Sequence, residues 1–247
     1  MKGADPEVFV SRDGNIVPVI GLIGGTKRRP RPLGVGAIQE DNVLAEFNIP
    51  PASSVSEWAS SLTSMLSSLR LLLADKGCDI SIESSYNFDE GVLLDAGPKA
   101  MELGCDPDFN AWSGLANRKP VAGSLRTAAG HIHIGMEGLL QDDVERLVQS
   151  HDLFLGVPSI IMDKDKMRRS MYGQAGAYRR KPYGFEYRTL SNFWLKSKEL
   201  MAWAYEQSER ALEFSGSVDG RVQQCINNHD ELLAYQLINE YELEMVA

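Results

Sequence analysis

Extended-chain signals come in pairs along this sequence, and helical signals separate the pairs. Asp13-Gly14 joins the first pair and is typical of a tight turn between strands. Strand pairs that alternate with helices predict an α+β fold with a largely antiparallel sheet, rather than a doubly wound parallel sheet. The predicted pairs are residues 7–10 with 15–20 and residues 35–38 with 43–49.

The longest helical signal begins at Ser53 or Ser54, either of which can cap a helix. Glu57 falls where a capping box places a carboxylate, and leucines recur at helical spacing until Gly77. The sequence therefore predicts a long helix here. Further predicted segments are helices over 141–155, 196–214 and 221–241, a strand over 80–83, and loops over 21–32 and 104–117.

Composition is that of an ordinary globular protein, with 247 residues, 43% hydrophobic and 24% charged. We expect one domain over residues 1–247. A net charge of −9 argues against nucleic acid as the main partner. No apolar run approaches the roughly 20 residues that span a bilayer, and no signal peptide is evident. The three cysteines have no CxxC spacing, which favours a reducing cytoplasm over a disulfide scaffold or a structural zinc site.

Two of the four histidines, His131 and His133, lie in a short apolar run between Gly130 and Gly135. Such a run predicts a strand. Because side chains two positions apart in a strand share a face, both imidazoles are expected to point the same way. They form a candidate pair of metal or phosphate contacts.

Charged side chains recur at the same strand spacing elsewhere in the sequence. The pattern of carboxylates, imidazoles and arginines on strand faces indicates a nucleotide site that uses a divalent metal. The charged motifs are Asp5 with Glu7, Glu40-Asp41 with Glu46, and Glu186 with Arg188.

The order and content of these motifs resemble the phage-encoded carboxylate-amine ligases, amidoligases related to the glutamate-cysteine ligases. The resemblance spans about residues 4–195. It implies a glutamine synthetase-like catalytic fold, in which a curved antiparallel sheet has helices packed on one face and holds ATP and divalent cations on its concave face. The motifs that carry the resemblance are residues 4–9, 40–48, 130–135, 168–179 and 184–188.

The resemblance also assigns roles to individual residues. Glu40 is an alternative to Asp41 as a metal ligand, and His133 is expected beside the nucleotide phosphates. The implied ligands of Mg²⁺ or Mn²⁺ are Asp5, Glu7, Asp41, Glu46, His131 and Glu186.

Arginines are the second part of the implied site, since a guanidinium matches two phosphate oxygens at once. Arg188 is expected to meet the transferred phosphate, with Arg168 and Arg179 as further catalytic contacts. Arg169 is a candidate ATP contact, for which a solvent-facing position is the alternative. Lys119 and Arg126 complete the candidate ATP-binding residues.

The implied reaction is ATP-dependent formation of an amide through an acylphosphate. Its partners are small-molecule or peptide acids and amines, in the host cytoplasm if a phage encodes the protein, and relatives often pair subunits. Two alternatives remain open from the sequence. A metal-dependent hydrolase would also use histidines and carboxylates, and a non-catalytic binding module could retain the same fold.

Overall fold

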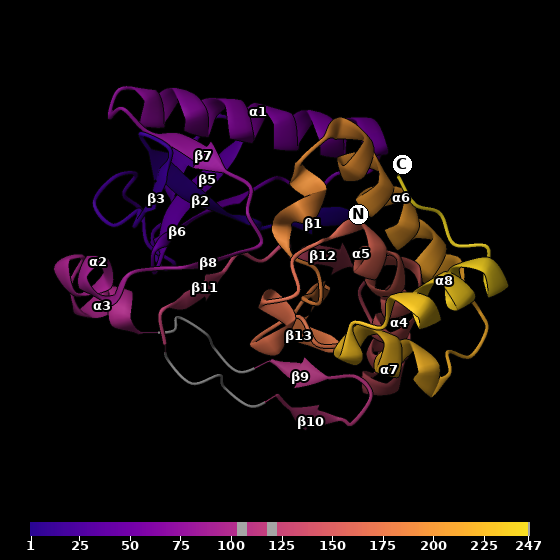
Figure 1. Ribbon diagram of the computed structural model, residues 1–247. Helices are drawn as coiled ribbons and strands as arrows, with labels where there is room; N and C mark the ends of the chain where they lie inside the picture. Colours follow the sequence, from indigo (N-terminus) through magenta and orange to yellow (C-terminus); the bar gives the residue numbers. More distant parts are fainter. Residues whose placement is uncertain (103–107, 118–122, 247) are drawn as a thin grey trace.

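The computed structural model describes residues 1–102, 108–117 and 123–246 (Figure 1). Every strand pairing within these residues is antiparallel. This confirms the predicted α+β class with antiparallel sheets. The strands are β1 (Lys2–Ala4), β2 (Glu7–Arg12), β3 (Asn15–Val17), β4 (Arg31–Leu33), β5 (Gly36–Asp41), β6 (Leu44–Asn48), β7 (Asp79–Ser81), β8 (Ser85–Asn87), β9 (Phe109–Asn110), β10 (Leu115–Ala116), β11 (Leu125–Thr127), β12 (Ile132–Gly135), β13 (Ala177–Lys181) and β14 (Gly184–Tyr187).

Helices fill much of the remaining described chain. None of the helices in these residues is both long and apolar enough to cross a bilayer. The α-helices are α1 (Val55–Ala74), α2 (Glu90–Asp95), α3 (Pro98–Met101), α4 (Gln141–His151), α5 (Val157–Met162), α6 (Lys198–Glu213), α7 (Gly220–Asn228) and α8 (Glu231–Glu240), and the other helical turns are η1 (Asp152–Gly156), η2 (Arg168–Ser170) and η3 (Asn192–Leu195).

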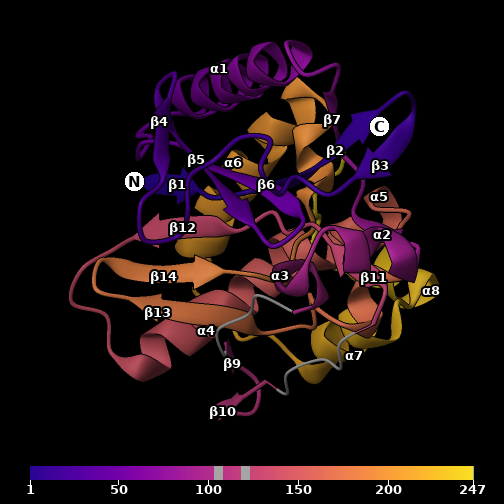
Figure 2. The ribbon, with the colours of Figure 1, turned by 90° about the vertical axis from the view of Figure 1, so that its left-hand side faces the viewer.

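Two six-stranded sheets meet where the chain passes from β1 to β2. Their strand orders are β1-β12-β14-β13-β9-β10 and β3-β2-β6-β5-β4, and the sixth strand of the second sheet is β7, which also pairs with β2. The segment that contains β6 runs along both β1 and β2, because Ile49 N–H donates to Ala4 O and Phe47 N–H donates to Pro6 O, each at 3.1 Å. The sheets therefore curl into one another at residues 4–6, and Figure 2 shows β12, β14 and β13 following β1 and β6.

The main hydrophobic core lies between the sheets and the helices α1, α4 and α6. Trp58 of α1 is fully buried, stacks on Trp194 with 5.6 Å between ring centroids, and donates its indole N–H to Met201 O at 2.9 Å. A smaller apolar cluster covers part of the opposite face, where Phe9 packs with Phe88 near α2 and α3. The rest of that opposite face carries the polar side chains described below.

Several predicted elements are confirmed with shifted ends. Ser54 caps α1 by accepting a hydrogen bond from Glu57 N–H, and Glu57 accepts one from the N–H of Ser53, one residue before the N-cap, in a variant of the capping box. The turn after β2 has Asp13 and Gly14 at positive φ, as a two-residue hairpin requires. Within the predicted loops, the structure contains β4 at residues 31–33 and the β9–β10 hairpin; residues 104–107 lie outside the described chain.

The predicted helix over residues 221–241 is wrong as a single element, since α7 and α8 are separate. His229 adopts a left-handed conformation with φ of 51°, which ends α7. Asp230 then caps α8 by accepting from Leu233 N–H at 3.0 Å. The apolar periodicity of residues 221–241 could not reveal this break, because the break depends on the backbone of His229 and the cap at Asp230.

The predicted helix over residues 141–155 continues beyond α4 as the π-helical turn η1, which begins at Asp152. The buried Asp152 carboxylate accepts hydrogen bonds from Trp112, Gly176, Tyr187 and Thr189 at 2.6–3.1 Å. Burial nevertheless raises the pKa of Asp152 to about 6. Its hydrogen bonds with Gly176 and Thr189 hold the segment before β13 next to the segment after β14.

Candidate active site

Side chains alternate between the two faces along β12. Its isoleucines enter the core, so His131 and His133 point to the opposite face. Strand register then places His133 opposite Glu186 of β14, and Glu186 opposite Arg179 of β13. One row of neighbouring side chains thus crosses three strands.

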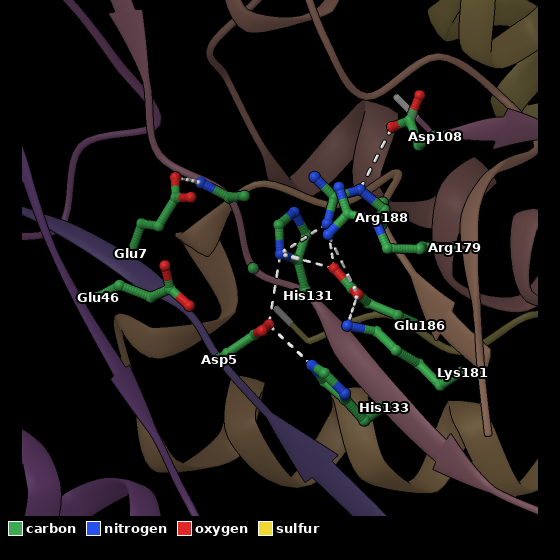
Figure 3. A network of polar contacts seen from close by, with 12 residues as sticks. Asp5, Glu7, Glu46, Asp108, His131, His133, Arg179, Lys181, Glu186 and Arg188 are labelled. Atoms are coloured by element: carbon green, nitrogen blue, oxygen red, sulfur yellow. Dashed lines mark hydrogen bonds and ion pairs between the residues drawn. The ribbon is translucent and has the colours of Figure 1, made fainter. Parts of the chain in front are cut away.

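A second row crosses the other sheet. Glu7 of β2 lies opposite Glu46 of β6, and Glu46 lies opposite Gln39 of β5. Asp5 follows β1 at the place where the two sheets meet. The curl of the sheets turns both rows toward the same space (Figure 3).

Asp5, His131, His133 and Glu186 form a group that we name the imidazole cluster. Asp5 Oδ1 lies 2.9 Å from His133 Nε2 and 3.3 Å from His131 Nδ1, and Glu186 Oε1 lies 3.3 Å from the same His131 nitrogen. Burial would raise the pKa of Asp5, but its hydrogen bonds with the two histidines outweigh burial and lower it. Burial and the charge of Arg188 lower the pKa of His131 to about 4.

Three cationic side chains surround the Glu186 carboxylate, which is only 1% exposed. Lys181 Nζ lies 2.8 Å from Oε2, Arg179 lies 3.7 Å from the same oxygen, and Arg188 contacts Oε1 directly. Arg188 also donates from Nε to Asp108 at 3.2 Å. Burial opposes ionisation of Glu186, but the charges of His131 and Arg188 outweigh it and lower its pKa to about 2.

Glu7, Asp41 and Glu46 form a second group, which we name the carboxylate cluster. Glu7 accepts a hydrogen bond from Ala129 N–H, and Glu46 accepts one from Gln39, each at 2.8 Å. Burial and the charge of Asp41 raise the pKa of Glu7 to about 8, and burial raises the pKa of both Asp41 and Glu46. The three acids therefore resist ionising together without a compensating cation.

Both clusters line one pocket with a volume of about 540 Å³. Lys27, Arg179, Lys181 and Arg188 bring positive charge to the same walls. Figure 3 shows the carboxylates of Asp5, Glu7 and Glu46 facing the histidines and the cationic side chains across this space. The pocket can thus hold a multiply charged ligand together with cations.

A smaller cavity of about 70 Å³ adjoins the pocket. Glu7, Asp41, His131 and Arg188 line both spaces, so the two spaces meet at these residues. The smaller cavity is also lined by Arg126 of β11, Arg168 of η2 and Asn42. The Asn42 side chain donates to Lys99 O and Glu102 O, at 2.6 and 2.5 Å.

Most residues predicted for the site do lie together. Arg126 and Arg168 line the smaller cavity instead of the larger pocket. Those that line the larger pocket are Asp5, Glu7, Asp41, Glu46, His131, His133, Arg179, Glu186 and Arg188.

Strand alternation separates the two acids that the sequence could not distinguish. Asp41 lines the pocket, whereas Glu40 points to the other face of β5 and accepts hydrogen bonds from Ile23 N–H and Gly24 N–H. Asp41 is therefore the better placed candidate ligand.

One other expectation differs from the structure, and one falls outside the described chain. Arg169 lines neither space; it is buried and donates to Ser159 Oγ at 2.8 Å, so it faces neither solvent nor the pocket. Adjacent residues in the turn η2 point in different directions, which explains why Arg168 and Arg169 separate. Lys119 lies outside the described residues.

The sequence reasoning missed Lys181 and Tyr183. Lys181 follows Arg179 at strand spacing, so recognising β13 would have placed both on one face. Tyr183 lies in the turn between β13 and β14, and its hydroxyl is 2.5 Å from His133 Nδ1. Lys27, from the predicted loop over residues 21–32, also lines the pocket.

The fold and pocket define an antiparallel α+β protein that gathers acids, imidazoles and guanidinium groups on one curled sheet surface. Residues 115–210 match the family model described as phage phiEco32-like COOH.NH2 ligase type 2. This match confirms the resemblance to the phage-type carboxylate-amine ligases that the motifs indicated. The matched segment contains His131, His133, Glu186 and Arg188. No curated protein shows significant similarity to the chain.

Proposed function

We propose that the protein is an ATP-dependent carboxylate-amine ligase that activates its acid substrate as an acylphosphate. The observation that carries the proposal is the presence of acidic clusters and several cationic side chains in one pocket of about 540 Å³. A reaction that brings a carboxylate to a triphosphate joins two anions. It therefore needs positively charged groups beside both reactants, together with metal ligands close by.

The donor atoms of both clusters fit divalent cations. Ligand atoms of Asp5, His133 and Glu186 lie within 4.8 Å of one another, as do those of Glu7, Asp41 and Glu46. The first set contains His133, whereas the family resemblance implies His131 as the metal contact. The carboxylate cluster suits Mg²⁺ or Mn²⁺, since hard cations prefer oxygen ligands.

Burial, followed by the charge of Asp41, raises the pKa of Glu7, and a cation in the carboxylate cluster would compensate both effects. When bound, the metal would reduce charge repulsion between the phosphates and the acid.

The cationic side chains would act on the phosphates. Arg188 lies between the two spaces, in contact with Glu186 and Asp108, so its orientation is fixed before substrate binds. Its guanidinium can donate to two oxygens of the transferred phosphoryl group. Arg179 and Lys181 project from the neighbouring strand toward the same place, which favours a phosphate site beside Glu186.

The proposed chemistry needs no covalent enzyme intermediate. A carboxylate oxygen of the acid attacks the γ-phosphorus, and the bond to the bridging oxygen breaks to release ADP. The amine nitrogen then attacks the acyl carbon, the bond from that carbon to the phosphate oxygen breaks, and the amine loses a proton. The products are an amide, ADP and inorganic phosphate.

The test is ADP release by the purified protein with Mg²⁺, ATP and a panel of acids and amines. Release that depends on both an acid and an amine supports ligation. Product formation that needs metal but no ATP would refute ligation and support the alternative metal-dependent hydrolase. Glu46→Gln should abolish ADP release, and Glu40→Gln is the matched control because that side chain faces away from the pocket.

A further inference from the structure

The smaller cavity has two buried arginines that form no ion pair with a carboxylate of the described chain, and Glu7, Asp41 and Asp108 line the same space. Arg126 and Arg168 are each 3% exposed and line this space. Within the described chain, Arg126 donates to the main-chain carbonyls of residues 100, 123 and 125, and Arg168 donates to those of residues 188 and 189. Main-chain oxygens satisfy hydrogen bonds but leave the positive charge of both guanidinium groups in place.

Both arginines also have a buried Nε–H group for which no residue of the described ranges provides a hydrogen-bond partner. Leaving a buried charged donor unpaired is costly, so native proteins generally provide a partner for it. The Nε–H of Arg169 likewise has no partner among the described residues, but Arg169 lines neither of the two spaces. Arg126 and Arg168 thus combine a charge, an unpartnered donor and a position in the wall of the smaller cavity.

The local backbone is built around the Arg168 guanidinium. A Cβ atom at Gly173 would lie 2.0 Å from Arg168 Nη1 and 2.6 Å from Thr189 O, so residue 173 must be glycine for the guanidinium to keep its position. Thr189 O accepts the Arg168 hydrogen bond at 2.8 Å. The arginine is therefore held in place before any ligand arrives.

The size of the cavity limits what can enter it. At about 70 Å³, it has roughly an eighth of the volume of the larger pocket, which is about 540 Å³. It therefore suits a small group such as a carboxylate on a short chain, whereas the larger pocket offers the room that a nucleotide needs. Its opening toward Arg188 places the occupant next to the proposed phosphoryl-transfer site.

We propose that the acid substrate is a compact molecule with two carboxylates, one of which reacts near Arg188 while Arg126 and Arg168 hold the other in the smaller cavity. The part that concerns the reacting carboxylate rests on the proposed ligase function. A planar carboxylate suits this place because it accepts parallel hydrogen bonds from a guanidinium fork. The second carboxylate would also position the first.

The test is calorimetric titration with malonate, succinate, glutarate and adipate, each compared with the monocarboxylate of the same chain length. Mg²⁺ is present and ATP is absent, so the measurement does not depend on turnover. We expect at least one dicarboxylate to bind about tenfold to a hundredfold more tightly than its monocarboxylate, as charge-assisted hydrogen bonds predict. Equal binding within every pair would overturn the proposal.

Variants locate the binding. Arg168→Gln should remove the preference for the dicarboxylate, and Arg169→Gln should keep it, because both arginines are buried but only Arg168 lines the cavity. Arg168→Lys retains the charge and tests the fork if the glutamine variant fails to fold. If Arg168→Lys and Arg126→Gln both keep the full preference, the cavity is not the binding site. Arg168-dependent binding of inorganic phosphate without binding of any dicarboxylate would also refute the proposal.

Failure of this proposal and failure of the ligase function give different results. ADP release with acids that carry only one carboxylate would support ligation and overturn the second-carboxylate site. Arg168-dependent dicarboxylate binding without ADP release in any acid and amine mixture would support the site and overturn ligation.

Discussion

The charge of Glu186 should contribute strongly to stability, because three cationic side chains surround a carboxylate that is only 1% exposed. The lowered pKa of Glu186 means that the folded state favours its charged form, and Arg188 contributes to that preference. Removing one partner of a buried ion pair costs about 3–5 kcal/mol in other proteins. We therefore expect Glu186→Gln to reduce the free energy of unfolding by about 3–5 kcal/mol at pH 7.

The assay is urea denaturation followed by tryptophan fluorescence, with a chelator present so that divalent cations do not contribute. Glu40→Gln is the matched control, since its amide oxygen can still accept the hydrogen bonds from residues 23 and 24. A loss below about 1 kcal/mol in Glu186→Gln, typical of an exposed ion pair, would refute the argument that this carboxylate balances buried charge.

The sign of the pH dependence is also fixed. Because the folded state lowers the pKa of Glu186, its contribution is complete above about 4.5 and declines as the pH falls toward 2. The stability difference between the wild type and Glu186→Gln should therefore stay constant from pH 7 to 5 and shrink at pH 4. A difference that grows on acidification would contradict the assignment.

Three further outcomes are expected. Arg179→Met should weaken ATP binding in calorimetry by about tenfold or more, as loss of a charged hydrogen bond predicts, and Arg180→Met, on the opposite face of β13, should not. Asp152→Ala should lower the free energy of unfolding in urea by about 3–5 kcal/mol, because it leaves buried donors unpaired. Mg²⁺ should bind more tightly at pH 9 than at pH 6 in calorimetry, since the proton on Glu7, whose pKa is raised to about 8, must leave first; equal affinity would exclude Glu7 as a ligand.

Strand periodicity was the most informative property of the sequence. It placed His131 with His133, and Glu186 with Arg188, because alternation fixes the face without knowledge of the remaining fold. The convergence of separate motifs on one pocket followed from the family resemblance, since spacing within a motif says nothing about distances between motifs. The structure brings Asp5 and Glu186 to the same histidine.

Positions outside regular strands were harder to predict. Arg168 and Arg169 are adjacent in a short helical turn, where direction depends on contacts that the sequence does not specify. The β13–β14 hairpin brings Lys181 and Tyr183 to the site, but its turn lacks an Asn-Gly or Asp-Gly signal. The sequence shows basic residues over 177–181, but it does not show that this segment is a strand.

The position of β1 has a consequence for how the protein folds. Lys2–Ala4 pairs on one side with residues 132–134 and contacts residues 49–52 on the other. During synthesis, its edge toward β12 has no partner until the chain has grown beyond residue 134. Pairings between such distant residues slow folding and leave strand edges open to other chains. Nascent chains of this protein should therefore depend on chaperones until β12, the partner of β1, has emerged from the ribosome.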